Sequence, residues 1–221
     1  MVKHTIIGVV GPKRSGKDTV ASILVRSNRF IVCPFASFLK DSCKAIFMLS
    51  DDQLHGNHKE SMDPRWNTTP RKILQSVGDL FRKKLSEFLP ELNMGNSETI
   101  WCRCFEIWLS QFSTPQCIVI PDVRFHDEAN LIKSLGGILL RVNRPGLEDT
   151  DDHESEQQQK GIEVEHTIEN DGTTTDLRTR VLSWYKTMSE GEVENKRKSL
   201  STSEEELRLS PKRVKLDADT D

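Results

Sequence analysis

The sequence predicts an α/β fold in which a central parallel sheet is covered by helices on both faces. Short apolar runs rich in β-branched residues, at 5–10 (TIIGVV) and 117–121 (CIVIP), have the composition of buried parallel strands. Segments of helical periodicity alternate with such runs, as is typical of a parallel sheet. A glycine-rich turn joins the first strand to the helix that follows it. Together these observations predict one three-layer domain.

The remaining elements follow from periodicity and from residues that begin or end a helix. Thr69-Pro70 provides an N-cap and a first helical residue, whereas Gly136-Gly137 ends a short helix and Asn170-Asp171-Gly172 closes the last strand. Residues 50–67 are polar and are expected to form loops with at most a short helix. The expected strands are 5–10, 30–35, 117–121, 138–142 and 167–168. The expected helices are 17–26, 37–49, 69–88, 98–112, 128–135 and 176–188.

Residues 189–221 differ in composition from the rest of the chain. They contain no aromatic residue, and Ser, Glu, Lys, Arg and Asp dominate. Such a segment cannot bury enough apolar surface to offset the entropy lost on ordering, so we expect a disordered tail. The folded domain is then expected to cover residues 1–188.

Composition excludes several classes of protein. The formal charge of −3 on 221 residues excludes a polycation that would coat nucleic acid non-specifically. No apolar run approaches the roughly 20 residues that a bilayer-spanning helix needs. The 5 cysteines are odd in number and include no CxxC pair, which indicates reduced, buried thiols rather than a disulfide or zinc framework.

The glycine-rich turn, GPKRSGKDT at 11–19, fits the phosphate-binding pattern GxxxxGK between a strand and a helix. Glycines let such a loop wrap a polyphosphate, its N–H groups point inward, and the helix N-terminus adds positive charge. We expect Lys17 to reach the β- and γ-phosphates. Asp18 stands where a Ser or Thr usually contacts Mg²⁺, so its carboxylate is a candidate metal ligand. The residues expected to hold the nucleotide phosphates are Gly11, Lys13, Arg14, Ser15, Gly16, Lys17, Asp18 and Thr19.

Charged residues follow the predicted strands at the sheet edge where this loop lies. Asp122 comes directly after CIVIP, at the carboxyl end of a central strand, where it can serve a metal shell. Arg124 follows two residues later, and Arg141 and Arg144 end the next strand. Arginines near a phosphate loop commonly neutralise charge that develops during phosphoryl transfer. The alternative for each arginine is a surface salt bridge.

The helix at 69–88 carries two parallel stripes of residues. Its apolar residues repeat at three- and four-residue steps and are expected to be buried. A second stripe, rotated by one residue, consists of Arg71, Gln75, Gly78 and Arg82. Arginines suit an anion, an amide can read a base edge, and a glycine leaves room for a ligand. The alternative is an ordinary solvated helix face.

These motifs, in this order, resemble the phage- and virus-type deoxynucleoside monophosphate kinases, a branch of the P-loop kinases. The resemblance runs through GPKRSGKDT, PFASFLK, TPRKILQSVGDLFRK, DVRF-x-x-E, DHESE and IENDGTTTDL. The animal-type phosphomevalonate kinases are similar too, since they share the loop with Asp after Lys, the ESE segment and the late IEN-x-G turn. The LQxxG helix favours the nucleotide enzyme. A third hypothesis is a non-catalytic P-loop module whose tail recruits nuclear partners.

The resemblance implies transfer of the γ-phosphoryl group of ATP to a deoxynucleoside 5′-monophosphate, with Mg²⁺. It implies that Lys17, Asp18, Asp122, Arg124 and Arg141 are catalytic, with Asp18 and Asp122 as the metal ligands. Asn170 and Gly172 would lie near the donor base. Where related sequences often have Asp-Pro before the Leu-Lys of PFASFLK, this chain has Ser37-Phe38. The residues implied for acceptor binding are Lys40, Arg71, Gln75, Gly78, Arg82, Arg124, His153, Ser155 and Glu156. Residues 148–156 (EDTDDHESE) lack EF-hand spacing and are expected to form a mobile, polar lid, with a metal site as the alternative.

The tail adds a prediction about location. Lys196-Arg197-Lys198 and Pro211–Asp217 (PKRVKLD) are basic clusters, and the second resembles a monopartite nuclear import signal. The alternative is a solvated charge run. We therefore expect an import receptor as a partner and a nuclear location. The folded part shows no basic stripe interleaved with aromatics, so direct nucleic-acid binding is not expected. No membrane partner is expected, and the sequence allows a homodimer without requiring one.

Overall fold

The computed structural model describes residues 2–95, 97–147 and 154–209. The chain divides into two units, Met1–Val181 and Leu182–Asp221. The first unit holds a parallel sheet and the candidate site. In the described part of the chain, no helix is long and apolar enough to cross a membrane.

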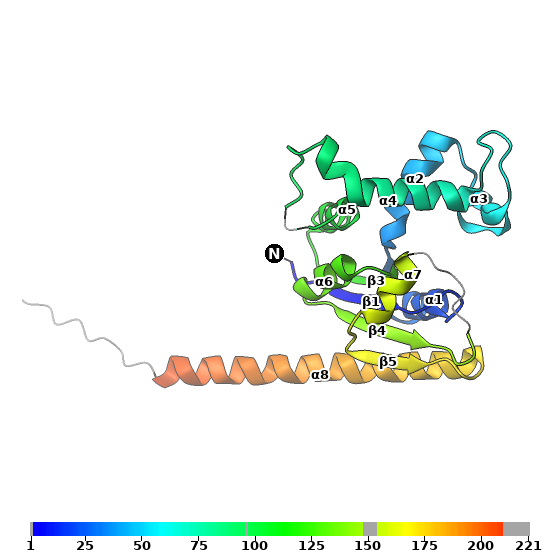
Figure 1. The fold of residues 1–221 in the computed structure, drawn as a ribbon. Coiled ribbons are helices and arrows are strands. Elements are labelled where there is room, and N and C mark those ends of the chain that lie inside the picture. Colours follow the sequence, from blue (N-terminus) through cyan, green and yellow to red (C-terminus); the bar gives the residue numbers. More distant parts are fainter. Residues whose placement is uncertain (1, 96, 148–153, 210–221) are drawn as a thin grey trace, which may run out of the picture. The chain divides into compact units, whose positions relative to one another are not determined.

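A five-stranded parallel sheet lies at the centre of the first unit (Figure 1). The strand order is β2-β3-β1-β4-β5, so β1 lies between β3 and β4. The α/β class and parallel sheet predicted from the sequence are confirmed. β2 keeps only two residues because the helix after it begins at Phe35, and β3 extends past residue 121 to include Asp122. The strands are β1 (Thr5–Val10), β2 (Ile31–Val32), β3 (Cys117–Val123), β4 (Ile138–Asn143) and β5 (His166–Glu169).

The helices match the predicted segments, with additions in the regions expected to be loops. Residues 50–67 contain α3 and the 3₁₀ helix η1, and Ser50 begins α3 with a reciprocal capping box to Gln53. Thr69 accepts the Lys72 N–H at 3.2 Å and caps α4 as expected. The helices are α1 (Lys17–Asn28), α2 (Phe35–Phe47), α3 (Asp51–His55), η1 (Asn57–Glu60), α4 (Pro70–Phe88), α5 (Ile100–Leu109), α6 (His126–Ser134), α7 (Glu154–Gln158), η2 (Gln159–Gly161) and α8 (Thr174–Leu209).

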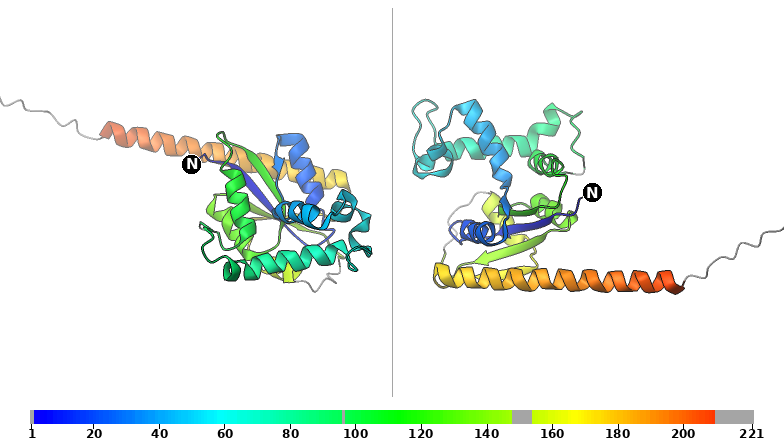
Figure 2. Two further views of the ribbon diagram at one scale, coloured as in Figure 1. Left: turned by 90° about the horizontal axis from the view of Figure 1, so that it is seen from above. Right: turned by 180° about the vertical axis from the view of Figure 1, so that it is seen from behind.

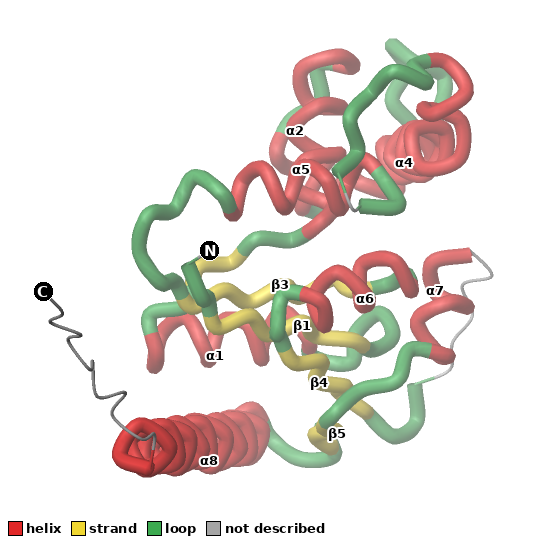
Figure 3. Tube along the Cα trace, turned by 90° about the vertical axis from the view of Figure 1, so that its left-hand side faces the viewer, coloured by secondary structure: helices red, strands yellow, loops and turns green. Residues whose placement is uncertain are grey.

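Alternate residues of β1 face the two sides of the sheet. Ile6 and Val10 pack with Phe105 of α5 and Ile132 of α6, whereas the buried Val9 faces the other side, where α1 lies (Figure 3). Right-handed crossovers that leave the centre of a sheet in opposite directions place their helices on opposite faces. Gly8 lets α6 pack closely, because a Cβ there would lie 2.7 Å from the Ile132 Cδ1 atom.

A second, smaller core lies among the helices that follow β2. It joins α2, α3 and α4 through Cys43, Leu49, Leu54, Ile73 and Leu74. Figure 2 shows these cyan helices grouped together on one side of the sheet. This helical group positions α4, whose residues the sequence assigned to an acceptor. Of the five cysteines, which were expected to be buried thiols, Cys33, Cys43 and Cys102 are buried, whereas Cys104 and Cys117 are half-buried.

Helix α8 is longer than the predicted segment 176–188. It begins at Thr174, buries Leu177 and Val181, and continues to Leu209. The import-like segment Pro211–Asp217 lies outside the described residues. The domain boundary at residue 188 and the disorder of residues 189–221 stay predictions.

Candidate active site

One cavity of about 370 Å³ collects most of the residues singled out in the sequence. The phosphate loop, the end of β3, α2 and α4 all contribute to its wall. The predicted residues that line it are Lys13, Arg14, Lys17, Asp18, Lys40, Arg71, Gln75, Gly78, Arg82, Asp122 and Arg124. Gly11, Ser15, Gly16 and Thr19 belong to the loop without lining the cavity. His153 lies outside the described residues, as do the side chains of Ser155 and Glu156.

The loop between β1 and α1 depends on two glycines in the left-handed region, Gly11 at φ +150° and Gly16 at φ +107°. A Cβ on Gly11 would lie 2.6 Å from the carbonyl oxygen of Val142, so the loop can only pass this close to β4 without a side chain. Lys17 begins α1, and its Nζ donates to the carbonyl oxygens of Gly11 and, at 2.7 Å, Pro12. Its ammonium group therefore sits over the loop, where phosphate is expected.

Asn170 supports the loop from behind. Its Nδ2 donates to the carbonyl oxygen of Ser15 at 2.7 Å, and a Cβ on Gly16 would lie 2.6 Å from the same Nδ2. Neither Asn170 nor Gly172 lines the cavity. The contact with a donor base that the resemblance implies for these two residues stays a prediction.

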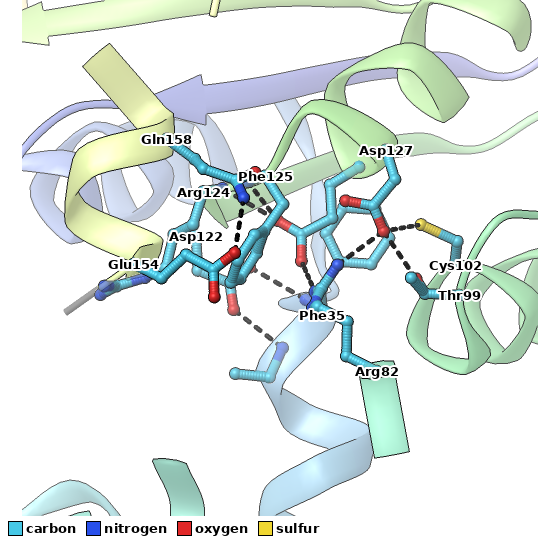
Figure 4. Close-up of polar contacts among 12 residues, drawn as sticks. Phe35, Arg82, Thr99, Cys102, Asp122, Arg124, Phe125, Asp127, Glu154 and Gln158 are labelled. Atoms are coloured by element: carbon cyan, nitrogen blue, oxygen red, sulfur yellow. Dashed lines mark hydrogen bonds and ion pairs between the residues drawn. The ribbon is translucent and has the colours of Figure 1, made fainter. Parts of the chain in front are cut away.

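Asp122 holds the start of α2. Its Oδ1 accepts the Phe35 N–H at 2.9 Å and its Oδ2 accepts the Ala36 N–H at 2.8 Å (Figure 4). Helix α2 needs this contact because its N-cap residue, Pro34, offers no side-chain acceptor. Burial raises the pKa of Asp122 above its ordinary value. The carboxylate thus fixes the helix that carries Lys40, and its role toward a metal stays a prediction.

Arg82 is held by the acids at the start of α6. Its Nη1 donates to Asp127 at 2.6 Å, its Nη2 donates to Glu128 at 2.8 Å, and its Cζ lies 3.6 Å from the centre of the Phe125 ring (Figure 4). Only 12% of the Arg82 side chain is exposed. The guanidinium is thus fixed across α4 and α6, although its atoms contribute to the cavity wall.

Glu128 links this contact to Arg124. Its second oxygen, Oε2, accepts the backbone N–H groups of Arg124 at 2.9 Å and Phe125 at 3.2 Å. The side chain is almost completely buried, and burial raises its pKa to about 8. A continuous path of hydrogen bonds therefore runs from α4 through Arg82 and Glu128 to the backbone of Arg124.

Comparison with known proteins places the chain in a family. The family model for deoxynucleotide monophosphate kinases matches residues 93–181. A provisionally assigned deoxynucleotide monophosphate kinase of Acanthamoeba polyphaga mimivirus is 40% identical over 186 residues, which cover 80% of this chain and 94% of the viral protein. The chain belongs to the deoxynucleotide monophosphate kinase family. It is therefore a nucleotide kinase, an ATP-dependent phosphotransferase, and the predicted family is confirmed.

Solved structures that resemble this kinase are more distant in sequence. TT1252 from Thermus thermophilus is 20% identical, with a TM-score of 0.47, over 84% of this chain and 97% of its own. The dephospho-CoA kinase from Campylobacter jejuni is 17% identical, with a TM-score of 0.43, over 85% of this chain and 98% of its own. The shikimate kinase from Aquifex aeolicus is 17% identical, with a TM-score of 0.39, over 85% of this chain and 99% of its own.

Arg141 of the kinase lies apart from the cavity wall. Its guanidinium donates to the carbonyl oxygens of Gln159, at 3.3 and 3.4 Å, and Ile162, at 2.5 Å. The structure therefore places Arg141 beneath η2, where it holds the segment that follows α7. Glu154, the first residue of α7, pairs with Lys83 of α4 at 2.5 Å. The predicted lid region thus contacts α4 through its described end.

The sequence missed several residues that the kinase brings to the cavity. Lys59 of η1 lines it, and so do Asp79 and Trp101. Phe125 and Glu128 also line the cavity, but they belong to the DVRF-x-x-E motif that the sequence analysis named. Beside them, Glu60 pairs with Arg71 and lies 3.7 Å from the Lys13 Nζ atom. Residues 57–60 show no periodic pattern, so no sequence signal marked Lys59 or Glu60. The E of DVRF-x-x-E did mark Glu128, as part of a motif whose physical role only the structure shows.

Proposed function

We propose that this chain transfers the γ-phosphoryl group of ATP to a deoxynucleoside 5′-monophosphate, giving a deoxynucleoside diphosphate and ADP for DNA synthesis. One observation carries the proposal: Lys17 of the phosphate loop and Arg71 and Gln75 of the acceptor helix line the same cavity. Phosphoryl transfer needs donor and acceptor phosphates side by side and in line. A shared cavity with both kinds of residue meets that need.

The roles of the residues follow from their positions. Lys17 and Arg14 hold the donor phosphates, and Arg124 at the mouth of β3 neutralises charge on the transferring group. Arg71 and Gln75 hold the acceptor. Because the acceptor phosphate attacks directly, no covalent intermediate on the protein is needed. Asn170 and Gly172, with the lid residues His153, Ser155 and Glu156, remain part of the proposal on the strength of the motifs alone.

The proposal includes Mg²⁺. No group of three or more His, Cys, Asp or Glu side chains is placed to hold a metal ion in the part of the chain that the structure describes. Mg²⁺ in nucleotide enzymes, however, usually keeps several waters and uses one or two carboxylates plus substrate phosphates. Asp18, exposed beside the loop, fits such a site, and Asp122 fits one through water because its hydrogen bonds leave lone pairs. Bound there, the ion would neutralise phosphate charge.

A coupled ADP-release assay tests the proposal. The purified full chain is supplied with ATP, Mg²⁺ and each of the four deoxynucleoside monophosphates, or with mevalonate 5-phosphate. We expect turnover with at least one nucleotide and none with the isoprenoid phosphate. Turnover with mevalonate 5-phosphate alone would overturn the proposal in favour of a phosphomevalonate kinase. ATP binding without any turnover would favour a non-catalytic nucleotide-binding module.

We also propose that the tail directs the enzyme to the nucleus. The basic segment Pro211–Asp217 has the composition that an import receptor recognises, and it begins 23 residues after the predicted domain boundary at residue 188. A tagged chain that ends at Met188 should keep its catalytic activity and lose nuclear accumulation. A truncated chain distributed like the full one would contradict this proposal.

A further inference from the structure

Four cationic side chains from four separate elements line the cavity. Lys40 comes from α2, Lys59 from η1, Arg71 from α4, and Arg124 from the segment after β3. All four are half-buried, whereas Lys72, next to Arg71 on the same helix, is exposed. Cations that merely keep a protein in solution are exposed, and burying several together is costly unless an anion joins them.

Lys59 is the member of this group that forms no ion pair with any acid in the described part of the chain. Its ammonium group makes no hydrogen bond or ion pair with any other described residue. Burial, reinforced by Lys40, Arg71 and Arg124, lowers its pKa to about 8, and only Glu60 acts in the opposite direction. A lysine in such a position binds an anion strongly, because the anion restores both the charge balance and the hydrogen bonds.

Two acids close to Lys59 and the other cations, Glu60 and Asp122, are already engaged. Glu60, the residue after Lys59, pairs with Arg71 and lies close to Lys13. Both oxygens of Asp122 accept backbone N–H groups of α2. An anionic ligand in the cavity would supply the charge that these two acids do not offer to Lys59.

We propose that Lys59 binds the phosphate group of the acceptor, a phosphomonoester dianion, together with Arg71. The proposal rests on the proposed function, because the acceptor phosphate is the anion that reacts in this cavity. The proposed function assigns Lys17 and Arg14 to the donor phosphates and Arg71 to the acceptor. Lys59 lines the same cavity, and Glu60, the residue after it, pairs with Arg71, which associates Lys59 with the proposed acceptor residues. Two cations from different elements also fix the direction of the phosphate, as an in-line reaction requires.

Protonation of Lys59 follows from this role. A phosphomonoester is already a dianion at pH 8, since its second pKa is about 6. Near pH 8 about half of the free enzyme carries an uncharged Lys59, and binding of the dianion draws a proton onto it. Acceptor binding should therefore take up a proton at pH 8 and should weaken as the pH rises further.

The kinetic test compares Lys59→Met with Lys59→Arg and with the exposed control Lys72→Met. In Lys59→Met we expect the KM for the nucleotide acceptor to rise about 10- to 100-fold, because a charge-assisted hydrogen bond is lost. The KM for ATP should stay within about twofold of the wild-type value. Lys59→Arg should recover acceptor binding and should remove its decline above pH 8, since arginine stays protonated. Lys72→Met should match the wild type.

A binding measurement separates this proposal from the proposed function. Calorimetric titration of the full-length chain at pH 8, in buffers of different ionisation enthalpy, reports affinity and proton uptake without turnover. We expect Lys59→Met to lose affinity for the deoxynucleoside monophosphate and to lose the proton uptake, while its affinity for the phosphate-free nucleoside is unchanged. Should no nucleotide bind to the wild type, the proposed function fails, and titration with mevalonate 5-phosphate then tests Lys59 as a phosphate ligand by itself.

Three outcomes would overturn the proposal. The first is an acceptor KM in Lys59→Met equal to that of the wild type. The second is an equal rise in KM for ATP and acceptor, which would indicate a general effect of charge on the cavity. The third is proton uptake that persists in Lys59→Met. Thermal denaturation of each variant guards against misfolding, and removing a half-buried, unpaired ammonium group should leave the melting temperature unchanged or higher.

Discussion

Arg82 and Glu128 join the acceptor helix to the mouth of the central strand, with Arg82 Nη2 at 2.8 Å from Glu128 Oε1. Both side chains are largely buried, at 12% and 4% exposed. The other Glu128 oxygen accepts the Arg124 N–H. These contacts connect α4 to the backbone of an arginine proposed to act on the transferring phosphoryl group. Arg82, assigned from the sequence to acceptor binding, is placed by the structure as a positioning residue as well.

Replacing Arg82 should destabilise the protein in a pH-dependent way. Arg82→Met leaves the carboxylates of Asp127 and Glu128 without their cation, and breaking a buried pair from one side costs roughly 3–5 kcal/mol. The loss in the free energy of unfolding should be largest above pH 8 and smaller at pH 5, where Glu128 is protonated in the folded protein. Urea denaturation of both proteins at pH 5, 7 and 8.5 measures this difference. A loss that is equal at all three values would contradict it.

Glu128 itself should make the free energy of unfolding depend on pH. Its pKa rises from 4.5 to about 8 on folding, so the folded state binds a proton more tightly than the unfolded chain does. The contribution to stability is complete below pH 4.5 and is lost as the pH rises to about 8. Glu128→Gln, which cannot titrate, should flatten the denaturation profile across that window. If the variant keeps the wild-type slope, another group is responsible.

Lys17 should be needed for the reaction and much less for the fold. In Lys17→Met the loop carbonyls of Gly11 and Pro12 lose a donor, which should cost about 1 kcal/mol of stability. The rate of ADP release should fall by at least about 100-fold, because a cation that stabilises the transferring group is gone. A variant that stays fully active would refute the phosphate-loop assignment. Thermal denaturation shows whether the variant is folded.

Gly78 should control the space available to the acceptor. A Cβ at this position would lie 3.1 Å from the Leu39 Cδ2 atom, the far end of a flexible side chain. Gly78→Ala should therefore be tolerated, and it should gain up to about 1 kcal/mol from helix propensity. Gly78→Leu should fill part of the cavity and raise the KM for the acceptor at least about tenfold, with little change for ATP. Equal acceptor KM values in the two variants would place the acceptor elsewhere.

Asn170 offers a choice between two roles. If it supports the loop through the Ser15 carbonyl, Asn170→Ala should weaken ATP and GTP alike, by about fivefold for one lost hydrogen bond of about 1 kcal/mol. If Asn170 instead contacts the donor base, the variant should change the ratio of the KM for ATP to the KM for GTP. The geometry favours the first result. The KM values for both nucleoside triphosphates, measured with a constant acceptor, decide between them.

The phosphate loop is a part of the site that residues close together in the sequence suffice to predict. Gly11, Gly16 and Lys17 act through backbone conformation and a helix start that lie within a few residues of one another, so their spacing alone predicted the loop. Asp122 is different. Its position after an apolar run predicted the sheet edge, but its partners, the N–H groups of Phe35 and Ala36, lie about 87 residues earlier in the chain. No local pattern encodes such a pairing.

The stripe of residues on α4 was likewise predicted in part from the sequence, while its contacts were shown only by the structure. Helical periodicity placed Arg71, Gln75, Gly78 and Arg82 on one face, and all four do line the cavity. Periodicity could not show that Arg82 meets Asp127 and Glu128, because that contact depends on how α4 packs against α6. Arg141 is a case in which the prediction from the sequence and the structure differ. Its position at a strand end beside the loop predicted a site residue. In the structure its guanidinium instead donates to the carbonyl oxygens of Gln159 and Ile162, beside η2.

By itself, then, the sequence determined the parallel α/β class, the phosphate loop, the face that α4 presents and the family to which the chain belongs. Each of these depends on spacing within one element or on motifs in a fixed order. The tertiary structure alone decided which charges meet. Arg82 pairs with Glu128 and Glu60 pairs with Arg71, whereas Lys59 pairs with no acid among the described residues. Charge–charge contacts form between elements far apart in sequence, and they depend on a few ångströms of packing that no periodicity records.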